Sequence, residues 1–322
     1  MIVTNIITRT DTYDISANGF ALSGINPSVS GYNANPIINS FDTVKVHSGL
    51  SDITIENMYF RGIPSKTFPT YHIVVDNDCS NIIIRGCVFD GATGGIIVRP
   101  GCKNVFIIGC TFRNMVYVPG AGAGNNGQNP AAGGAGSYGV VFHEEPKTVQ
   151  INNEQVEVPG GVTHGVISGC VFEPTVVRHA VYIQSSSDVL ISDNVIYGTT
   201  AMNSQTLLDA LLTTGLTDAQ INAFDVTKHM TVYDSAISFR GCSNVRIINN
   251  YLNGGICCLN GSTDTTQDHH EGELYLFKDN IVKNYTKPSG GINRLFNLNN
   301  INSVVKENNT ISNCTGYSQY WL

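Results

Sequence analysis

The residues of this chain that could carry out chemistry gather between positions 143 and 240. Carboxyl groups are plentiful there, and the candidates are Glu144, Glu145, Glu173 and Asp234. Hydrolysis of a glycosidic bond usually needs two such groups, one protonated as general acid and one ionised as nucleophile or base. The sequence does not tell which two of the four would face each other.

The same stretch offers a second chemistry, the β-elimination of a uronic-acid polymer. His143, His179 or Tyr182 would then act as base, and Arg178 or Arg240 would neutralise the carboxylate of the substrate. We rank hydrolysis slightly ahead, because carboxyl groups are abundant and no obvious catalytic Lys is present.

These residues belong to a sequence that repeats itself. Residues 81–89 and 104–112 match closely, and residues 164–172 repeat their ending. Weaker copies are residues 51–60, 188–196, 244–252 and 274–282. Each copy has an anchor residue two positions before its final apolar residue. The anchors are Met58, Cys87, Cys110, Cys170, Asn194, Asn250, Asn280 and Asn309. Successive anchors are 29, 23, 60, 24, 56, 30 and 29 residues apart.

A second type of strand precedes each anchor segment, so each repeat holds at least two strands. These strands are expected at residues 71–76, 94–99, 138–143, 179–184, 235–240, 255–260 and 294–299. A repeat this short cannot bury its own apolar side and must stack on its neighbours. Alternation supplies the inward residues, as in Ile82/Ile84, Val105/Ile107 and Val245/Ile247. We therefore predict an all-β, right-handed parallel β-helix.

The anchor column is expected to stack like on like, with Cys87 above Cys110 and Asn194 beside Asn250. Stacked buried Asn side chains satisfy backbone groups and one another, so this ladder is interpreted as structural. The nine Cys are interpreted as free, mostly buried thiols, which fits synthesis in a reducing cytoplasm.

Interruptions of the repeat point to the site. We expect a cap and first coil at residues 1–50, the β-helix at 51–315 and a tail at 316–322. Three insertions interrupt this β-helix: a Gly-rich loop (116–137), a β-hairpin (146–160) and two short α-helices (201–232). The loop and the helical insertion leave their coils at the same place, so they should form two lips over the coil at 173–194. Loops on a rigid scaffold commonly carry function.

Strand parity predicts an outward polar column beside this coil. Its expected members are Asp76, Arg99, His143, Gln184, Arg240, Asn260 and Asn299, with Tyr182 and Ser238 two places earlier. Such a ladder would pair with sugar hydroxyls, so Asp76, Arg99, Gln184, Ser238 and Arg240 are the candidate substrate-binding residues. His179 shares parity with inward Val181, so it is either catalytic or a satisfied interior histidine.

Composition limits the partners. Apolar residues make up 42% and charged residues 13% of the chain, which suits strands and tight turns. The net charge of -7 argues against nucleic-acid binding, which needs clustered cations. No charged segment followed by an apolar run marks a secretion signal, and no stretch is long enough to span a bilayer, so a soluble protein is expected.

No metal or other cofactor is predicted. Residues 268–271 (Asp-His-His-Glu) lack the spacing of zinc ligands and are interpreted as a turn. Asp76, Asp78 and Asp90 could hold calcium, but three acids alone are weak evidence.

The coils resemble those of the pectate-lyase-like β-helix superfamily, most of all the bacteriophage tailspike polysaccharide depolymerases. The resemblance lies in His-Ala-Val-Tyr-Ile-Gln at 179–184 followed by Asp-Val-Leu-Ile-Ser-Asp-Asn at 188–194, and it covers about residues 50–315. It is specific for the fold, since no catalytic motif of the family maps onto this chain residue by residue.

The resemblance implies a depolymerase of a bacterial surface glycan. Such a protein would be made in the host cytoplasm, incorporated into the phage tail of the virion and assembled as a homotrimer. No separate virion-binding or trimerisation domain is evident, which leaves an excised core, a compact spike or a cellular enzyme open. The rival is a non-catalytic glycan-binding adhesin or virion protein. Two carboxylates about 5 to 10 Å apart would favour the enzyme.

Overall fold

The computed structural model describes residues 13–23, 37–39, 44–61, 71–91, 94–113, 137–144, 147–151, 154–158, 160–173, 178–197, 235–255, 257–262, 275–286, 295–299 and 304–317. Among them every regular element is a strand. They form three nine-stranded sheets and one two-stranded hairpin.

Successive strands along the chain enter the three sheets in turn. The first sheet contains β1 (Tyr13–Ile15), β4 (Val44–Val46), β7 (Tyr71–Val75), β10 (Gly94–Val98), β13 (Ser137–Phe142), β18 (Arg178–Gln184), β21 (Ser235–Arg240), β24 (Cys257–Ser262) and β27 (Phe296–Asn299). The second contains β2 (Ala21–Ser23), β5 (Ser51–Glu56), β8 (Ser80–Arg85), β11 (Lys103–Ile108), β16 (Thr163–Ser168), β19 (Ser187–Ser192), β22 (Ser243–Ile248), β25 (Tyr275–Lys278) and β28 (Val304–Glu307). The third contains β3 (Ile37–Asn39), β6 (Tyr59–Arg61), β9 (Val88–Asp90), β12 (Thr111–Arg113), β17 (Val171–Phe172), β20 (Val195–Tyr197), β23 (Tyr251–Gly255), β26 (Ile281–Tyr285) and β29 (Thr310–Ser312).

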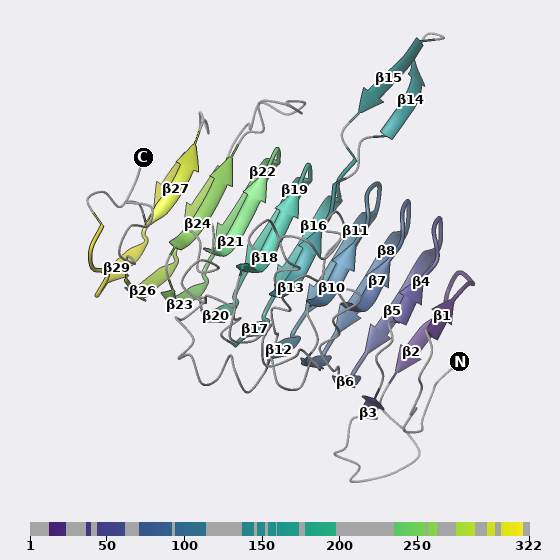
Figure 1. Ribbon diagram of the computed structural model, residues 1–322, viewed down its shortest axis with the longest axis horizontal. Helices are drawn as coiled ribbons and strands as arrows, with labels where there is room; N and C mark the ends of the chain where they lie inside the picture. Colours follow the sequence, from purple (N-terminus) through teal and green to yellow (C-terminus); the bar gives the residue numbers. More distant parts are fainter. Residues whose placement is uncertain are drawn as a thin grey trace, which may run out of the picture.

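Each strand pairs in parallel with the corresponding strand of the next coil, as β7 does with β10 and β10 with β13. The stacked strands form the elongated body seen in Figure 1. The predicted right-handed parallel β-helix is confirmed. The predicted hairpin is also present, as β14 (Lys147–Ile151) paired antiparallel with β15 (Glu154–Val158), and it projects from the body.

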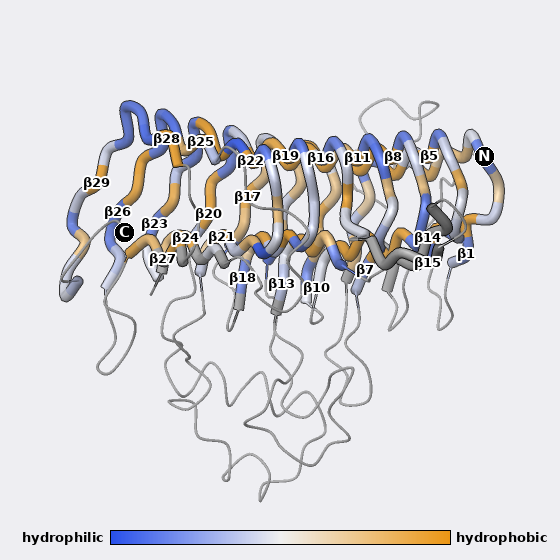
Figure 2. Tube along the Cα trace, turned by 90° about the horizontal axis from the view of Figure 1, so that it is seen from above, coloured by the Kyte–Doolittle hydropathy of each residue, from blue (hydrophilic) through white to orange (hydrophobic). Residues whose placement is uncertain are grey.

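The inward residues follow the predicted parity. Ile82, Ile84, Val105 and Ile107 of the second sheet are all 0% exposed. The inward residues of the first sheet, from Val75 through Phe142 to Phe239, are buried as well. Figure 2 shows the apolar colour running along the strands and the hydrophilic colour concentrated at the turns.

Each anchor segment contains two strands rather than one. A single residue in the left-handed region bends the chain from the second sheet into the third, for example Gly86 (φ 59°), Gly109 (φ 60°) and Asn249 (φ 57°). Gly and Asn adopt this conformation at the lowest cost. The following anchor residue then points into the core, as the buried Cys87 does.

The predicted thiol state is confirmed for the cysteines whose side chains the structure describes. Seven of them are free and buried, and Cys314 is free and half-buried. The anchor thiols stack, since the Cys110 backbone N–H lies 3.4 Å from Cys170 Sγ.

Aromatic side chains of the third sheet form a second stack. The ring centroids of Phe60, Phe89, Phe112 and Phe172 follow one another at 5.0, 4.9 and 4.6 Å. This spacing is that of neighbouring strands, so each ring packs on the next. His72 lies against this stack, with its ring 5.8 Å from both Phe60 and Phe89.

Acid is expected to destabilise the fold through His72. The imidazole is 4% exposed, its Nε2–H donates to the Gly91 carbonyl at 3.0 Å, and burial lowers its pKa from 6.5 to about 4. Between these two values the unfolded chain binds more protons than the folded one, so stability falls as pH falls. The expected loss is about 3 kcal/mol by pH 4.

Urea unfolding measured at several pH values tests this expectation. His72→Phe should flatten the dependence between pH 6.5 and 4. His164→Asn, at an exposed position where neighbouring coils carry Asn81 and Asn104 in register, should leave it unchanged. Equal slopes for His72→Phe and the unsubstituted protein would contradict the assignment.

The segments 114–136 and 198–234 connect β12 to β13 and β20 to β21, as the predicted lips require. The predicted Gly-rich loop, apart from Ser137 in β13, and the two predicted helices lie outside the described residues. Among the described residues no helix is long and apolar enough to cross a membrane.

Candidate functional site

One outward row of polar residues runs along the ends of the first-sheet strands. It consists of Asp76, Arg99, His143, Gln184 and Arg240, which we call the outer row. Backbone hydrogen bonds fix its register: Arg99 N donates to Val75 O at 2.8 Å and His143 N to Val98 O at 2.9 Å. Gln184 pairs with Arg240.

The row confirms the predicted column except at one position. Arg240 pairs with Ser262, and Ser262 pairs with Asn299, whereas Asn260 pairs with Ser238. The prediction was wrong for Asn260, because β24 extends to Ser262 rather than ending at residue 260. Tyr182 and Ser238 pair with each other, as expected.

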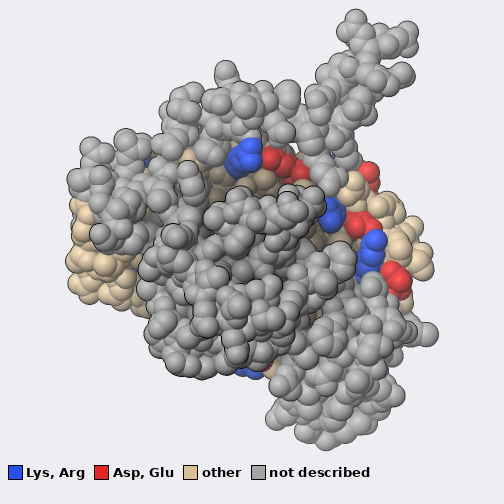
Figure 3. All heavy atoms as spheres, in the orientation of Figure 1, with Lys and Arg blue, Asp and Glu red and all other residues tan. Residues whose placement is uncertain are grey.

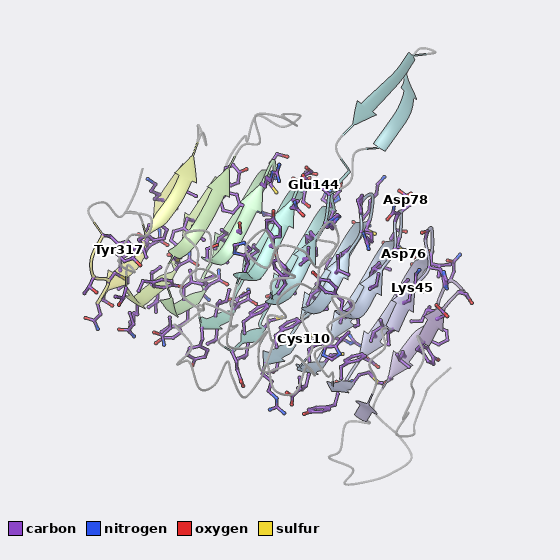
Figure 4. All side chains as sticks on the ribbon, in the orientation of Figure 1. Lys45, Asp76, Asp78, Cys110, Glu144 and Tyr317 are labelled. Atoms are coloured by element: carbon purple, nitrogen blue, oxygen red, sulfur yellow. The ribbon has the colours of Figure 1, made fainter. Side chains whose placement is uncertain are left out.

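Glu144 contacts two members of the outer row, Gln184 and Arg240. Gln184 Nε2 donates to Glu144 Oε1 at 3.1 Å, and Ser185 Oγ donates to Oε2 at 2.5 Å. Arg240 Nη1 lies 3.8 Å from Oε1. The Glu144 side chain is 14% exposed and therefore mostly buried. Figure 4 shows Glu144 on the same side of the molecule as Asp76 and Lys45.

Sequence reasoning missed Ser185, which the turn after β18 brings to Glu144. Ser185 has a φ of 42°, in the left-handed region, where the chain leaves the first sheet. A glycine in a neighbouring coil makes room for this turn, since a Cβ at Gly161 would lie only 2.0 Å from the Ser185 carbonyl oxygen.

Three rings from β13 and β18 lie together beside this cluster. Tyr138 and Tyr182 are stacked with centroids 5.8 Å apart, and the His179 ring lies 5.1 Å from Tyr182. Burial raises the pKa of the Tyr182 phenol to about 12, so the phenol stays protonated at neutral pH. It also hydrogen-bonds Arg240. The raised pKa disfavours Tyr182 as a general base.

His179 has the surroundings of a structural histidine. Its side chain is 4% exposed, and Nδ1 lies 3.1 Å from Ser235 Oγ and 3.3 Å from the Ser235 backbone nitrogen. The sequence left a catalytic and an interior role open, and these contacts favour the interior one.

The structure separates two of the four candidate carboxylates. Glu144 follows β13 at the turn from the first to the second sheet, whereas Glu173 follows β17 at the turn from the third sheet to the first. The seven residues of β18 span the distance between these two turns, about 20 Å at 3.3 Å per residue. Glu144 and Glu173 therefore do not form a pair. Glu145, Asp234 and the Arg178 side chain lie outside the described residues.

Asp76 and Asp90, two of the three acids considered for calcium, are paired with cations. Asp76 lies 3.1 Å from Lys45 Nζ, and Asp90 lies 2.9 Å from Arg113 Nη2 and accepts a hydrogen bond from Tyr59. Within the described part of the chain no three His, Cys, Asp or Glu side chains gather as metal ligands. The Asp-His-His-Glu segment at 268–271 lies outside that part.

Comparison with known proteins gives no matching family model and no matching curated protein. Among solved structures, the catalytic domain of a GH87 α-1,3-glucanase in complex with nigerose is similar, with 11% identity over 97% of this chain and 54% of that chain and a TM-score of 0.37. Two single-residue variants of such a domain, one with nigerose and one with tetrasaccharides, have 12% identity and TM-scores of 0.44 and 0.41. The chain spans about half the length of these catalytic domains.

Proposed function

We propose that this protein is a polysaccharide depolymerase that hydrolyses a bacterial surface glycan along the outward side of the first sheet. The observation that carries the proposal is the Glu144 carboxylate, held by Gln184, Ser185 and Arg240 beside the rings of Tyr138 and Tyr182. Sugars bind through paired hydroxyl hydrogen bonds and through aromatic faces, and this cluster offers both.

Glu144 is proposed as the nucleophile or base of the reaction. Two hydrogen-bond donors and a guanidinium surround its carboxylate and fix its position, as a nucleophile or base requires. Glu145 is proposed as the general acid, because Glu173 lies at the opposite end of the strand and Asp234 directly precedes β21, whose last residue is Arg240.

Hydrolysis is proposed in preference to β-elimination as the reaction of this depolymerase. Two of the three proposed bases for elimination are poorly suited, since the Tyr182 phenol is protonated at neutral pH and Nδ1 of His179 is occupied by Ser235. His143 remains the candidate base for the lyase alternative.

The proposal includes a role as a phage tailspike in the virion and assembly as a homotrimer. The tailspike-like coil sequences at 179–184 and 188–194 and the free buried thiols support it. Sedimentation equilibrium should give three times the monomer mass, whereas a monomer at all concentrations would contradict the trimer.

Incubation with a panel of bacterial capsules, O-antigens and pectins tests the reaction. We expect new reducing ends without the ultraviolet absorbance of an unsaturated uronic acid. That absorbance would instead indicate elimination. Glycan binding without any product would contradict an enzyme and support the non-catalytic adhesin or virion protein.

A further inference from the structure

We infer that the glycan bound along the outer row is uncharged, built from neutral sugars rather than uronic acids. This inference rests on the proposed function, because it concerns the same face of the first sheet. It follows from the charges on that face and from the sequences of the segments that join it to the third sheet.

Positive and negative groups alternate along this face. At its N-terminal end His47 Nε2 lies 3.0 Å from Asp14, and Lys45 Nζ lies 3.1 Å from Asp76. Figure 3 shows Lys or Arg atoms and Asp or Glu atoms in alternation along one edge of the described surface. The face therefore carries no excess of positive charge.

The cation at the centre of the candidate site already has an acidic neighbour. The Arg240 guanidinium lies 3.8 Å from Glu144 and hydrogen-bonds the Tyr182 phenol. A substrate carboxylate would have to compete with Glu144 for Arg240 and would itself be repelled by the Glu144 charge. A sugar hydroxyl meets no such repulsion.

The segments that join the third sheet to the first sheet on these coils add no compensating cations. Residues 114–136 and 174–177 contain no Asp, Glu, Lys or Arg. Residues 198–234 contain Lys228 against four acids, Asp209, Asp218, Asp225 and Asp234. With a net charge of -7 for the whole chain, the protein would repel rather than attract a polyanion.

Besides the two arginines of the outer row, the side chains near Glu144 are neutral donors and acceptors. Gln184 offers an amide and Ser185 offers a hydroxyl. Tyr138 and Tyr182 add ring faces. This combination fits the hydroxyl groups and apolar faces of neutral sugars. Sugar hydroxyls both donate and accept hydrogen bonds, whereas an ionised carboxylate only accepts them.

Matched pairs of glycans test the inference: a neutral polysaccharide and its derivative with primary hydroxyls oxidised to carboxylates, and an acidic polysaccharide and its carboxyl-reduced derivative. Cleavage is measured with the unsubstituted protein and binding with Glu144→Gln. We expect the neutral member of each pair to be preferred at least tenfold, with a rate unchanged between low and high salt, because no charge pair is screened.

The outcomes separate the inference from the proposed function. Preference for the acidic members, with rates that fall in high salt, would overturn the inference and leave a depolymerase. Binding of neutral members without cleavage would support the inference and overturn hydrolysis. A protein that binds and cleaves no member of either pair overturns both.

A charge variant gives an independent test. Asp76→Asn removes the partner of Lys45, so binding of the oxidised glycan relative to binding of the neutral form should rise at least threefold. Asp188→Asn makes the same charge change on the second sheet, where Asp188 contacts His164 and Asn244, and should leave this ratio unchanged. Equal gains in the two variants, or no gain in Asp76→Asn, would contradict the inference.

Discussion

Replacing Glu144 with Gln is expected to lower the rate of glycan cleavage by about 10²- to 10⁴-fold, the range that a positioned acid or base contributes. The variant keeps the size of the side chain and removes its charge, so the contacts with Gln184 and Ser185 change little in geometry. Glycan binding should persist, because the neighbouring donors and rings are retained. Initial rates of reducing-end release measure the effect.

Glu56→Gln is the matched control for this experiment. Glu56 is also an ion-paired glutamate, 2.6 Å from Arg85 Nη2, and its side chain is 20% exposed, but it lies on the second sheet. Its substitution should leave the rate within twofold. A Glu144→Gln variant that cleaves at a rate within threefold of the unsubstituted protein would exclude Glu144 as a catalytic group and leave Glu145, Glu173 and Asp234.

Replacing Asn250 with Ala is expected to cost about 3 kcal/mol of unfolding free energy or more. Asn250 Oδ1 accepts from the Asn194 backbone N–H and side chain at 3.0 Å each, and Nδ2 donates to the Ile191 carbonyl at 2.9 Å and to Asn280 Oδ1 at 3.0 Å. The side chain is 1% exposed. Truncation leaves several buried polar groups without partners, at about 1 to 3 kcal/mol each. Urea unfolding measures the loss.

Two variants show whether burial and the ladder cause this loss. Asn253→Ala removes an exposed hydrogen bond of 2.8 Å with Asn284 and should cost about 0.5 kcal/mol or less. Asn250→Cys should lose less than Asn250→Ala, because Cys170 occupies the same column and its Sγ accepts a backbone N–H. Equal losses for Asn250→Ala and Asn253→Ala would show that the ladder contributes little.

Much of the fold was predictable because one coil repeats the contacts of the next. The spacing between Cys87 and Cys110 is one coil, and these residues stack as predicted. The parity of Val75 and Val98 likewise fixed the outward positions of Asp76 and Arg99. The third sheet was missed, because a single left-handed residue such as Gly109 bends the chain without interrupting the apolar pattern.

The candidate site was less predictable, because it depends on turns rather than on strands. The alternation of inward and outward side chains along each strand correctly predicted that Gln184 and Arg240 belong to the outer row. It could not show that the turn after β18 brings Ser185 onto Glu144, nor that a whole strand separates Glu144 from Glu173. The strand expected at residues 255–260 ends at Ser262 in the structure. The predicted column therefore included Asn260, whereas Ser262 is the residue that pairs with Arg240.

The crystal structure of the Glu144→Gln variant with an oligosaccharide tests the central claim most directly. We predict a neutral oligosaccharide along the outer row, with sugar hydroxyls bonded to Gln184 and Arg240 and a ring face near Tyr138 or Tyr182. An oligosaccharide bound on the outer side of the second or third sheet, with the surroundings of residue 144 free of sugar, would contradict the account.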